Sequence, residues 1–275
     1  MKITKTVLGI FLTTFLIGLV FVSSTKRKVV EPILLTNTIA DPKPKAPLDS
    51  KIDREIEKKF FDWQEEDETK FRIKLLEAGE GFHGDEIKAK SGEVWLGLFK
   101  ENDKYFLRST KIKVRPGYDA VIDEAGEKTG KDVVVKGKNQ PLFLVKNAGM
   151  LKEGEIKTIF SPQSSDDGES LQNGFVADYI FNGNNYTLRV DGEENSSKLI
   201  LESENTKQVL FFVDAVGDSI WRLNWVGDLD GDGKLDVYAD LPVFYNFSQR
   251  RLFLSSQAEN GKLVKQVAMF HTSGC

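Results

Sequence analysis

Residues 220–241 read IWRLNWVGDLDGDGKLDVYADL, and an acidic centre divides them into two apolar halves. Apolar side chains occupy alternate positions in each half: Trp221, Leu223 and Trp225 in the first, and Val237, Ala239 and Leu241 in the second. A period of two is typical of a strand with one buried face, so Trp221, Leu223 and Trp225 are expected to share a face. The pattern therefore predicts two β-strands joined by a loop over residues 228–236.

Short apolar runs separated by turn residues continue through most of the chain. The runs are 94–99, 105–107, 133–135, 142–145, 179–181, 186–190, 199–201, 209–213 and 252–254. Turn signals lie between several of them, at Glu101-Asn102-Asp103, Asn182-Gly183-Asn184 and Asp191-Gly192. Many short strands with frequent turns favour a mainly β, antiparallel fold and disfavour a doubly wound α/β fold. Residues 51–275 are expected to form this β-rich region, with a possible domain seam at the polar segment 161–173.

The acidic centre places aspartates at loop positions 1, 3, 5 and 9, which are Asp228, Asp230, Asp232 and Asp236. Gly231 and Gly233 supply the backbone freedom with which the loop can curl around one point. Lys234 can offer only its backbone carbonyl, because an ammonium group cannot bind a cation. Carboxylates and carbonyls are the ligands of calcium, which takes six to eight oxygens, whereas magnesium requires a tighter octahedron. The loop is therefore expected to bind calcium through its four carboxylates and the Lys234 carbonyl.

The loop is not an EF-hand, because its twelfth position is Ala239 rather than glutamate and its flanks are predicted strands. The run from Gly227 to Gly233, GDLDGDG, followed by Asp236 and a strand, resembles the FG-GAP or VCBS-type calcium loops of integrin-like β-propellers. The resemblance implies calcium bound by Asp228, Asp230, Asp232, the Lys234 carbonyl and Asp236. The loop occurs in a single copy, whereas a propeller needs several repeats. The resemblance therefore extends to the loop and not to the fold.

Residues 1–50 are predicted to be separate from the globular part. An apolar run from Val7 to Val22 follows two lysines and precedes the basic triplet Lys26-Arg27-Lys28. Such a run is typical of a signal peptide or of a single-pass membrane anchor over residues 1–25, and both alternatives stay open. The proline-containing residues 26–50 are expected to form a linker. Either alternative places the bulk of the chain outside the cytoplasm, membrane-anchored in one case and secreted or periplasmic in the other.

Residues 50–63 predict a short amphipathic helix that begins with Ser50 as its N-cap. Ile52, Ile56, Phe60 and Trp63 fall at helical spacing and form one apolar stripe. The stripe is expected to pack on the rest of the domain, or to dock on another membrane protein if it is exposed.

The sequence contains no recognisable catalytic set. It has no G-x-S-x-G, H-E-x-x-H or C-x-x-C motif, and its single cysteine, Cys275, rules out an intrachain disulfide. His83 lies in an expected loop and has no partner that the sequence identifies. The net charge of −4, without a basic face, argues against nucleic acid as a partner.

Two functions therefore stay open. The first is a non-enzymatic, calcium-stabilised β module that binds a protein or glycan or contributes to envelope structure. The second is an extracytoplasmic hydrolase whose acidic pair cannot be identified among the 42 acidic residues. A strongly perturbed carboxylate pair in a deep cleft would favour the hydrolase.

Overall fold

The computed structural model describes residues 68–137, 139–162, 168–193, 196–213 and 219–274. The expected signal or anchor segment, the linker and the helix over residues 50–63 lie outside the described residues. The described residues all belong to one compact unit, Asp53–Cys275. Within them, no helix has the length and hydrophobicity that a membrane crossing requires.

The described part of the chain consists of one short 3₁₀ helix, η1 (Glu68–Lys70), and strands that pair antiparallel throughout. The strands are β1 (Lys74–Leu76), β2 (Gly79–Phe82), β3 (Val94–Glu101), β4 (Lys104–Gly117), β5 (Gly130–Val135), β6 (Pro141–Lys146), β7 (Gly154–Phe160), β8 (Glu169–Ser170), β9 (Val176–Phe181), β10 (Asn184–Glu193), β11 (Ser196–Ser203), β12 (Thr206–Val213), β13 (Arg222–Asp228), β14 (Asp236–Asp240), β15 (Phe247–Leu254) and β16 (Lys265–Ser273). The predicted mainly antiparallel β fold is therefore confirmed for the described residues.

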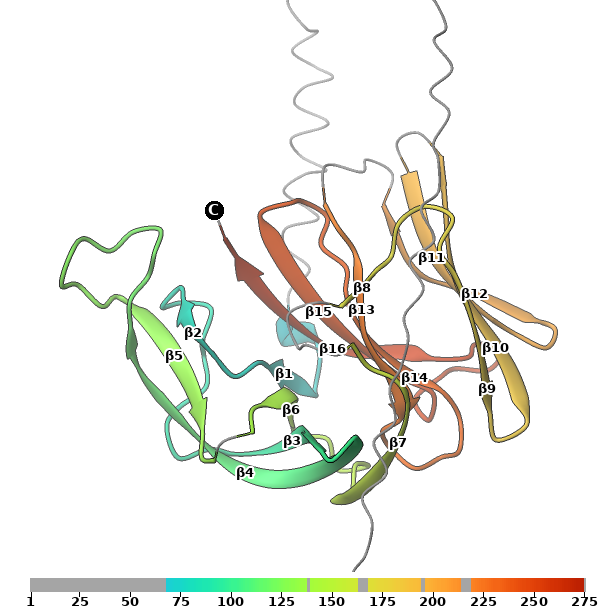
Figure 1. Ribbon diagram of the computed structural model, residues 1–275, viewed down its shortest axis with the longest axis horizontal. Helices are drawn as coiled ribbons and strands as arrows, with labels where there is room; N and C mark the ends of the chain where they lie inside the picture. Colours follow the sequence, from blue (N-terminus) through green and yellow to red (C-terminus); the bar gives the residue numbers. More distant parts are fainter. Residues whose placement is uncertain (1–67, 138, 163–167, 194–195, 214–218, 275) are drawn as a thin grey trace, which may run out of the picture. The chain divides into compact units, whose positions relative to one another are not determined.

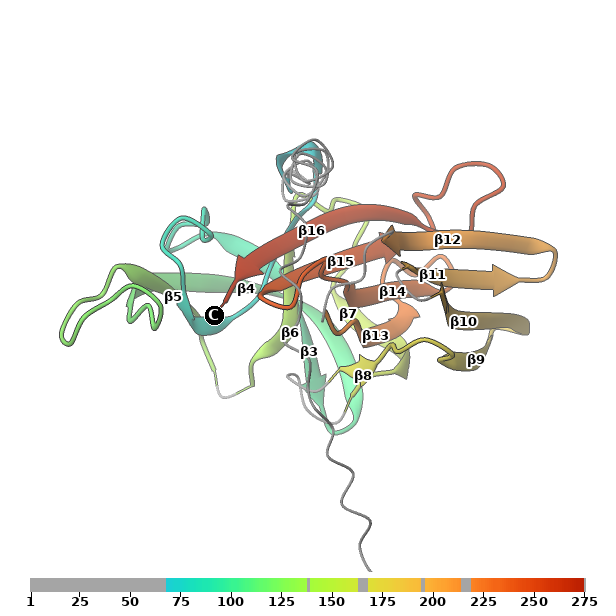
Figure 2. The same ribbon diagram turned by 90° about the horizontal axis from the view of Figure 1, so that it is seen from above.

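The larger sheet has 12 strands and curls so that its two ends come together (Figures 1 and 2). Its main path runs β1-β6-β3-β4-β7-β13-β14-β15-β16, with β5, β2 and β8 attached at the side. The long strand β4 pairs with β7 near its start and with β5 near its end, so it carries the sheet around a bend. The two end strands, β1 and β16, are in contact but form no ladder with each other.

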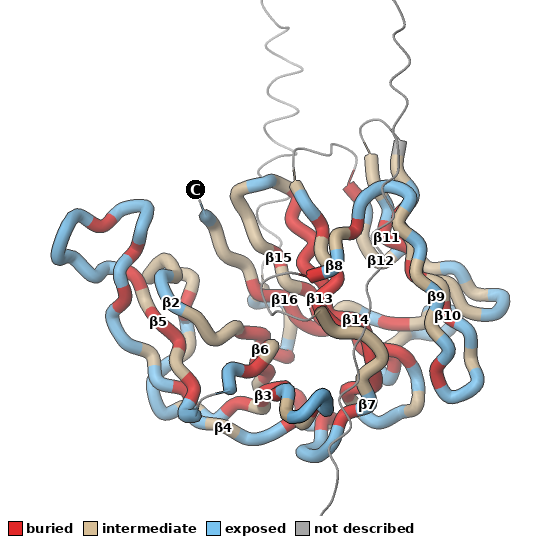
Figure 3. Tube along the Cα trace, in the orientation of Figure 1, coloured by how far each residue is buried: buried red, intermediate tan, exposed pale blue. Residues whose placement is uncertain are grey.

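The smaller sheet has four strands in the order β12-β11-β10-β9 and packs against β13, β14 and β15. These three strands are therefore covered on both faces, and Figure 3 shows them largely buried. All five residues of β14 are buried. Burial on both faces explains why this part of the sequence is so rich in apolar residues.

Two core clusters lie on the opposite faces of these central strands. The first core cluster faces β1 and β3–β6 and includes Phe143, Trp225, Tyr238, Leu252 and Phe270. The second core cluster faces the four-stranded sheet and includes Leu188, Leu201, Leu223, Val237 and Phe253.

The expectation that Trp225 shares a face with Trp221 and Leu223 is wrong. Trp225 lies in the first core cluster, whereas Trp221 and Leu223 lie in the second. The pairing of β13 with β14 shifts register between Leu223 and Trp225, because an extra residue, Asn224, is inserted there. Such a bulge turns every following side chain to the other face of the sheet.

The expected turn at Asp191-Gly192 is also wrong, because these residues belong to a strand. Asp191 and Gly192 lie inside β10, where they pair with Lys198 and Ser197 of β11. The turns at Asn102-Asp103 and Asn182-Gly183 are confirmed, because these residues join β3 to β4 and β9 to β10 with positive φ angles. A two-residue turn of this kind matches the right-handed twist of the strands that it connects.

Candidate metal centre

The acidic loop joins β13, which ends at Asp228, to β14, which begins at Asp236. Leu229 and Leu235, next to the two ends, are each 1% exposed and lie in the first and second core clusters respectively. These leucines fix both ends of the loop. Gly231 and Gly233 have φ angles of 76° and 83°, a left-handed conformation that glycine adopts without strain.

Three of the loop carboxylates converge on one point. One oxygen from each of Asp228, Asp230 and Asp236 lies within 4.8 Å of the other two. Asp228 and Asp236 are buried and Asp230 is half-buried. Negative groups this close repel one another, so a cation between them would stabilise the arrangement. The group could therefore hold a metal ion.

Backbone donors hold the two buried carboxylates in place. Asp228 accepts hydrogen bonds from the Gly231 amide at 2.8 Å and from the Gly233 amide at 3.0 Å. Asp236 accepts hydrogen bonds from the Leu229 amide through Oδ2 and from an amide beyond β15 through Oδ1, both at 2.7 Å. A carboxylate oxygen has two lone pairs, and Asp228 Oδ1, Asp228 Oδ2 and Asp236 Oδ2 each accept one of these bonds, so each keeps a lone pair for a cation.

Asp232 lies beside the three converging carboxylates and is not one of them, and the Lys234 carbonyl stays a predicted ligand. Asp232 is exposed, and its Oδ1 accepts the Lys234 amide at 2.8 Å. The same Asp232 oxygen lies 3.0 Å from the hydroxyl of Ser255, which also lies 2.8 Å from Asp236 Oδ1. Asp232 therefore stands at the edge of the group, next to Asp236.

Two serines that follow β15 were not expected from the sequence. Ser255 uses its amide and its hydroxyl toward Asp236. Ser256 donates its hydroxyl to Asp230 at 2.5 Å. The residue separations are 19 and 26, so no local motif connects these serines to the loop.

The two buried carboxylates, Asp228 and Asp236, are poorly stabilised as anions when no cation is present. Burial raises the pKa of Asp236 to about 8, and the charge of Asp230 adds to this effect. Burial likewise raises the pKa of Asp228. A bound divalent cation reverses this effect, because it favours the ionised form of its ligands.

A second acidic set combines the half-buried Glu77, after β1, with the buried Asp240 of β14 and with residues of β14 and β15. Arg250 contacts Glu77 at 3.0 Å and Asp240 at 2.8 Å, and Tyr238 donates to Glu77 at 2.6 Å. Burial raises the pKa of both carboxyl groups. Neither lines any of four cavities that lie among the described residues. We therefore interpret this set as a buried structural network rather than the acidic pair of a hydrolase.

His83 has a partner that the sequence did not identify. Its Nδ1 lies 2.5 Å from Oδ2 of Asp119, a carboxylate that is fully buried. Asp119 and Asp123 also accept hydrogen bonds from backbone amides of the loop between β4 and β5. The pair therefore joins this loop to the segment after β2. No nucleophile contacts His83 among the described residues.

No protein-family model, no curated protein and no solved structure matches this chain. The case for its function therefore rests on the residues and geometry described above.

Proposed function

We propose that this chain is a calcium-binding, β-rich protein that acts outside the cytoplasm as a binding or envelope-structural module, tethered to a membrane or released from it. The observation that carries the proposal is the convergence of the Asp228, Asp230 and Asp236 carboxylates. Calcium is held by Asp228, Asp230 and Asp236, with Asp232 and the Lys234 carbonyl completing the shell, as the FG-GAP-like sequence of the loop implies.

The proposed ligand set supports calcium over magnesium. The separations alone fit either ion, because one oxygen from each of the three carboxylates lies within 4.8 Å of the other two. Calcium takes six to eight oxygens from carboxylates and backbone carbonyls and tolerates irregular geometry. Magnesium requires a near-ideal octahedron and usually keeps several waters, so it seldom uses a loop that supplies four carboxylates and a carbonyl.

The proposed location supports the same ion. Calcium sites in extracellular modules have dissociation constants of roughly 10⁻⁴–10⁻³ M, so they fill only where calcium is abundant. The apolar run from Val7 to Val22 provides the reason to place the chain in such a compartment. The role of the ion is to fix the loop between the two core clusters, and the ligand of the module is a protein or a glycan.

Isothermal titration calorimetry of the full chain with calcium and with magnesium tests the metal. We expect one calcium site and much weaker magnesium binding, and we expect Asp236→Asn to lose the calcium signal. Equal binding of both ions, or calcium binding unchanged by Asp236→Asn, would contradict the proposal.

The location needs a separate experiment. In cells that express the full chain with a C-terminal epitope, the epitope should be released into the medium, or protease should remove it once any outer membrane is permeabilised and while the cytoplasmic membrane is intact. Protection of the epitope until the cytoplasmic membrane is lysed would place the β unit in the cytoplasm.

A further inference from the structure

A cavity of about 310 Å³ lies where the two ends of the curled sheet meet. Its wall includes residues of β1 and β16, the end strands that touch without forming a ladder. Strand β3, the end of β6, the helix η1 and the segment between β2 and β3 complete it. The cavity therefore exists because the sheet does not close at this point.

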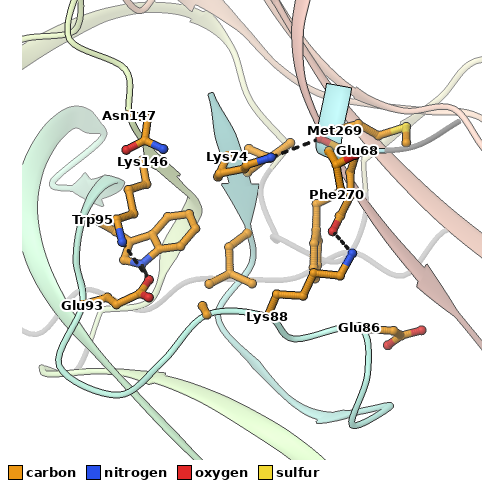
Figure 4. Close-up of a pocket in the computed structure, with 14 residues that line it drawn as sticks. Glu68, Lys74, Glu86, Lys88, Glu93, Trp95, Lys146, Asn147, Met269 and Phe270 are labelled. Carbon is orange, nitrogen blue, oxygen red and sulfur yellow. Dashed lines mark hydrogen bonds and ion pairs between the residues drawn. The ribbon is translucent and has the colours of Figure 1, made fainter. Parts of the chain in front are cut away.

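The floor of the cavity is apolar. It is formed by Leu75 and Leu76 of β1, Trp95 of β3, and Met269 and Phe270 of β16. Each of these side chains is at most 5% exposed, so the floor is rigidly packed from behind. Figure 4 shows Trp95 on one side of the cavity and Phe270 on the other. Such a floor favours the apolar part of a ligand.

The rim carries three lysines and three glutamates, and two of the lysines are neutralised. Lys88 pairs with Glu68 at 2.7 Å. Lys146 pairs with Glu93 at 3.0 Å, and Glu93 also accepts the Trp95 indole N–H at 3.1 Å. These contacts leave little charge at either end of the rim.

The remaining glutamate is occupied on the far side of the cavity. Glu86 Oε1 accepts the amide and the hydroxyl of Ser273, at 2.6 and 2.9 Å. Its Oε2 accepts the amide of His83 at 3.0 Å. Figure 4 shows its carboxylate directed away from Lys74 and Trp95.

Lys74 is the one rim lysine without a carboxylate partner among the described residues. Its Nζ makes a long contact of 3.4 Å with the backbone carbonyl of Glu68. Figure 4 shows Lys74 between the Trp95 side and the Glu68 side of the cavity. A positive charge of this kind beside an apolar floor is complementary to a ligand with one anionic group and an apolar body.

We propose that this cavity binds a small organic carboxylate. The apolar body of the ligand lies on the apolar floor of the cavity, and its anionic group lies at Lys74. The cavity has room for roughly ten water-sized groups, at about 30 Å³ for each. A single aromatic ring with a short acidic chain fits this space, whereas a two-chain phospholipid does not. This inference does not depend on the calcium site.

Calorimetric titration of the full chain in detergent, with a micelle-only blank and constant calcium, tests the proposal. The probes are 3-phenylpropionate, its neutral amide and 3-phenylpropylammonium, which share a body and differ in charge. We expect the carboxylate to bind about tenfold more tightly than the amide, the difference of one charge-assisted hydrogen bond, and the ammonium to bind more weakly still. Equal binding of carboxylate and amide, or no binding of the carboxylate, would overturn the proposal.

Variants distinguish the contribution of the Lys74 charge to binding from that of the apolar space. Lys74→Gln should weaken carboxylate binding to the level of the amide, and Lys74→Arg should retain it because the charge is kept. Ala89→Trp should fill the cavity and remove binding of the carboxylate and of the amide. Lys262→Gln, an exposed lysine paired with Glu259, is the control and should bind like the unmodified chain. Carboxylate binding that survives Lys74→Gln would exclude Lys74 as the recognition group.

Discussion

The side-chain amide of Asn182 donates a hydrogen bond of 2.7 Å to the carbonyl oxygen of Gly233. This bond joins the β9–β10 turn of the four-stranded sheet to the acidic loop of the larger sheet. It is therefore a direct link between the candidate metal centre and the second sheet.

Asn182→Gly should lower the free energy of unfolding by about 0.5–1.5 kcal/mol, because the turn conformation is kept and the hydrogen bond is lost. Asn102→Gly is the matched control, since Asn102 has a similar φ angle (49° against 48°) in the β3–β4 turn and no side-chain hydrogen bond is found for it in the described part. Urea unfolding of both variants measures the difference. Equal losses in the two variants would mean that the Asn182–Gly233 bond contributes nothing.

Calcium should raise the melting temperature of the full chain, and a chelator should lower it. At ten to a hundred times the dissociation constant, the ion stabilises the folded state by about 1–3 kcal/mol. Asp230→Ala should lose this dependence, because it removes one of the three converging carboxylates. Glu124→Ala, at an exposed acid in the loop between β4 and β5, should retain it. If the melting temperature of the unmodified chain were the same with calcium and with the chelator, the proposal that the loop binds calcium would be wrong.

The acidic loop shows how far spacing within the sequence can predict a site. The positions of the four loop aspartates predict that their carboxylates converge, and an oxygen from each of Asp228, Asp230 and Asp236 does lie with the others, whereas Asp232 is outside that group. The convergence is local, because Leu229 and the two glycines fix the chain between them. Ser255 and Ser256 could not be predicted, since only the β14–β15 pairing places them against the loop.

The same distinction holds for the fold. Hairpins with a two-residue turn, such as β9–β10, follow from Asn-Gly between apolar runs. Strand β16 was not expected, because its four buried residues 267–270 are consecutive and show no alternation. The Asn224 bulge was also missed, since a single inserted residue leaves the apolar pattern unchanged while it reverses the faces.

Pairs that join distant segments had no signal in the sequence. His83 and Asp119 are 36 residues apart, and Glu77 and Tyr238 are 161 apart. Both contacts depend on the order of the strands in the larger sheet, which the periodicity of single segments does not contain.

The His83–Asp119 pair should make stability depend on pH. The hydrogen bond to Asp119 raises the pKa of His83 in the folded state. The protonated histidine therefore stabilises the fold below its unfolded pKa of about 6.5, and this contribution is lost as the pH rises through the folded pKa. Urea unfolding should show that the free energy of unfolding falls as the pH rises through this range, and that His83→Gln and Asp119→Asn both reduce the fall. If the free energy fell as steeply with pH in His83→Gln as in the unmodified chain, groups other than His83 would cause the fall.

Gly227 should tolerate no side chain. A Cβ there would lie 2.4 Å from the carbonyl oxygen of Lys157 on β7 and 2.4 Å from the Trp225 ring. Gly227→Ala should therefore destabilise the protein by about 1–3 kcal/mol, since backbone and a packed indole must both move. Gly149→Ala is the control, because its Cβ would meet nothing within 4 Å. Equal unfolding midpoints for the two variants would contradict the packing of β7 on β13.

Tyr238 tests whether the buried acidic network is structural. Its hydroxyl is the donor to Glu77, and removal of the hydroxyl in Tyr238→Phe leaves a half-buried carboxylate with Arg250 as a partner. The loss should be about 1–3 kcal/mol, because a hydrogen bond to a charged acceptor is removed. Tyr245→Phe is the matched control at a side chain that is 73% exposed, and it should be neutral. Because the ring of Tyr238 packs on Phe143 at 4.6 Å and is unchanged in the variant, the difference between the two midpoints reports the hydroxyl alone. A neutral Tyr238→Phe would show that Arg250 suffices for Glu77.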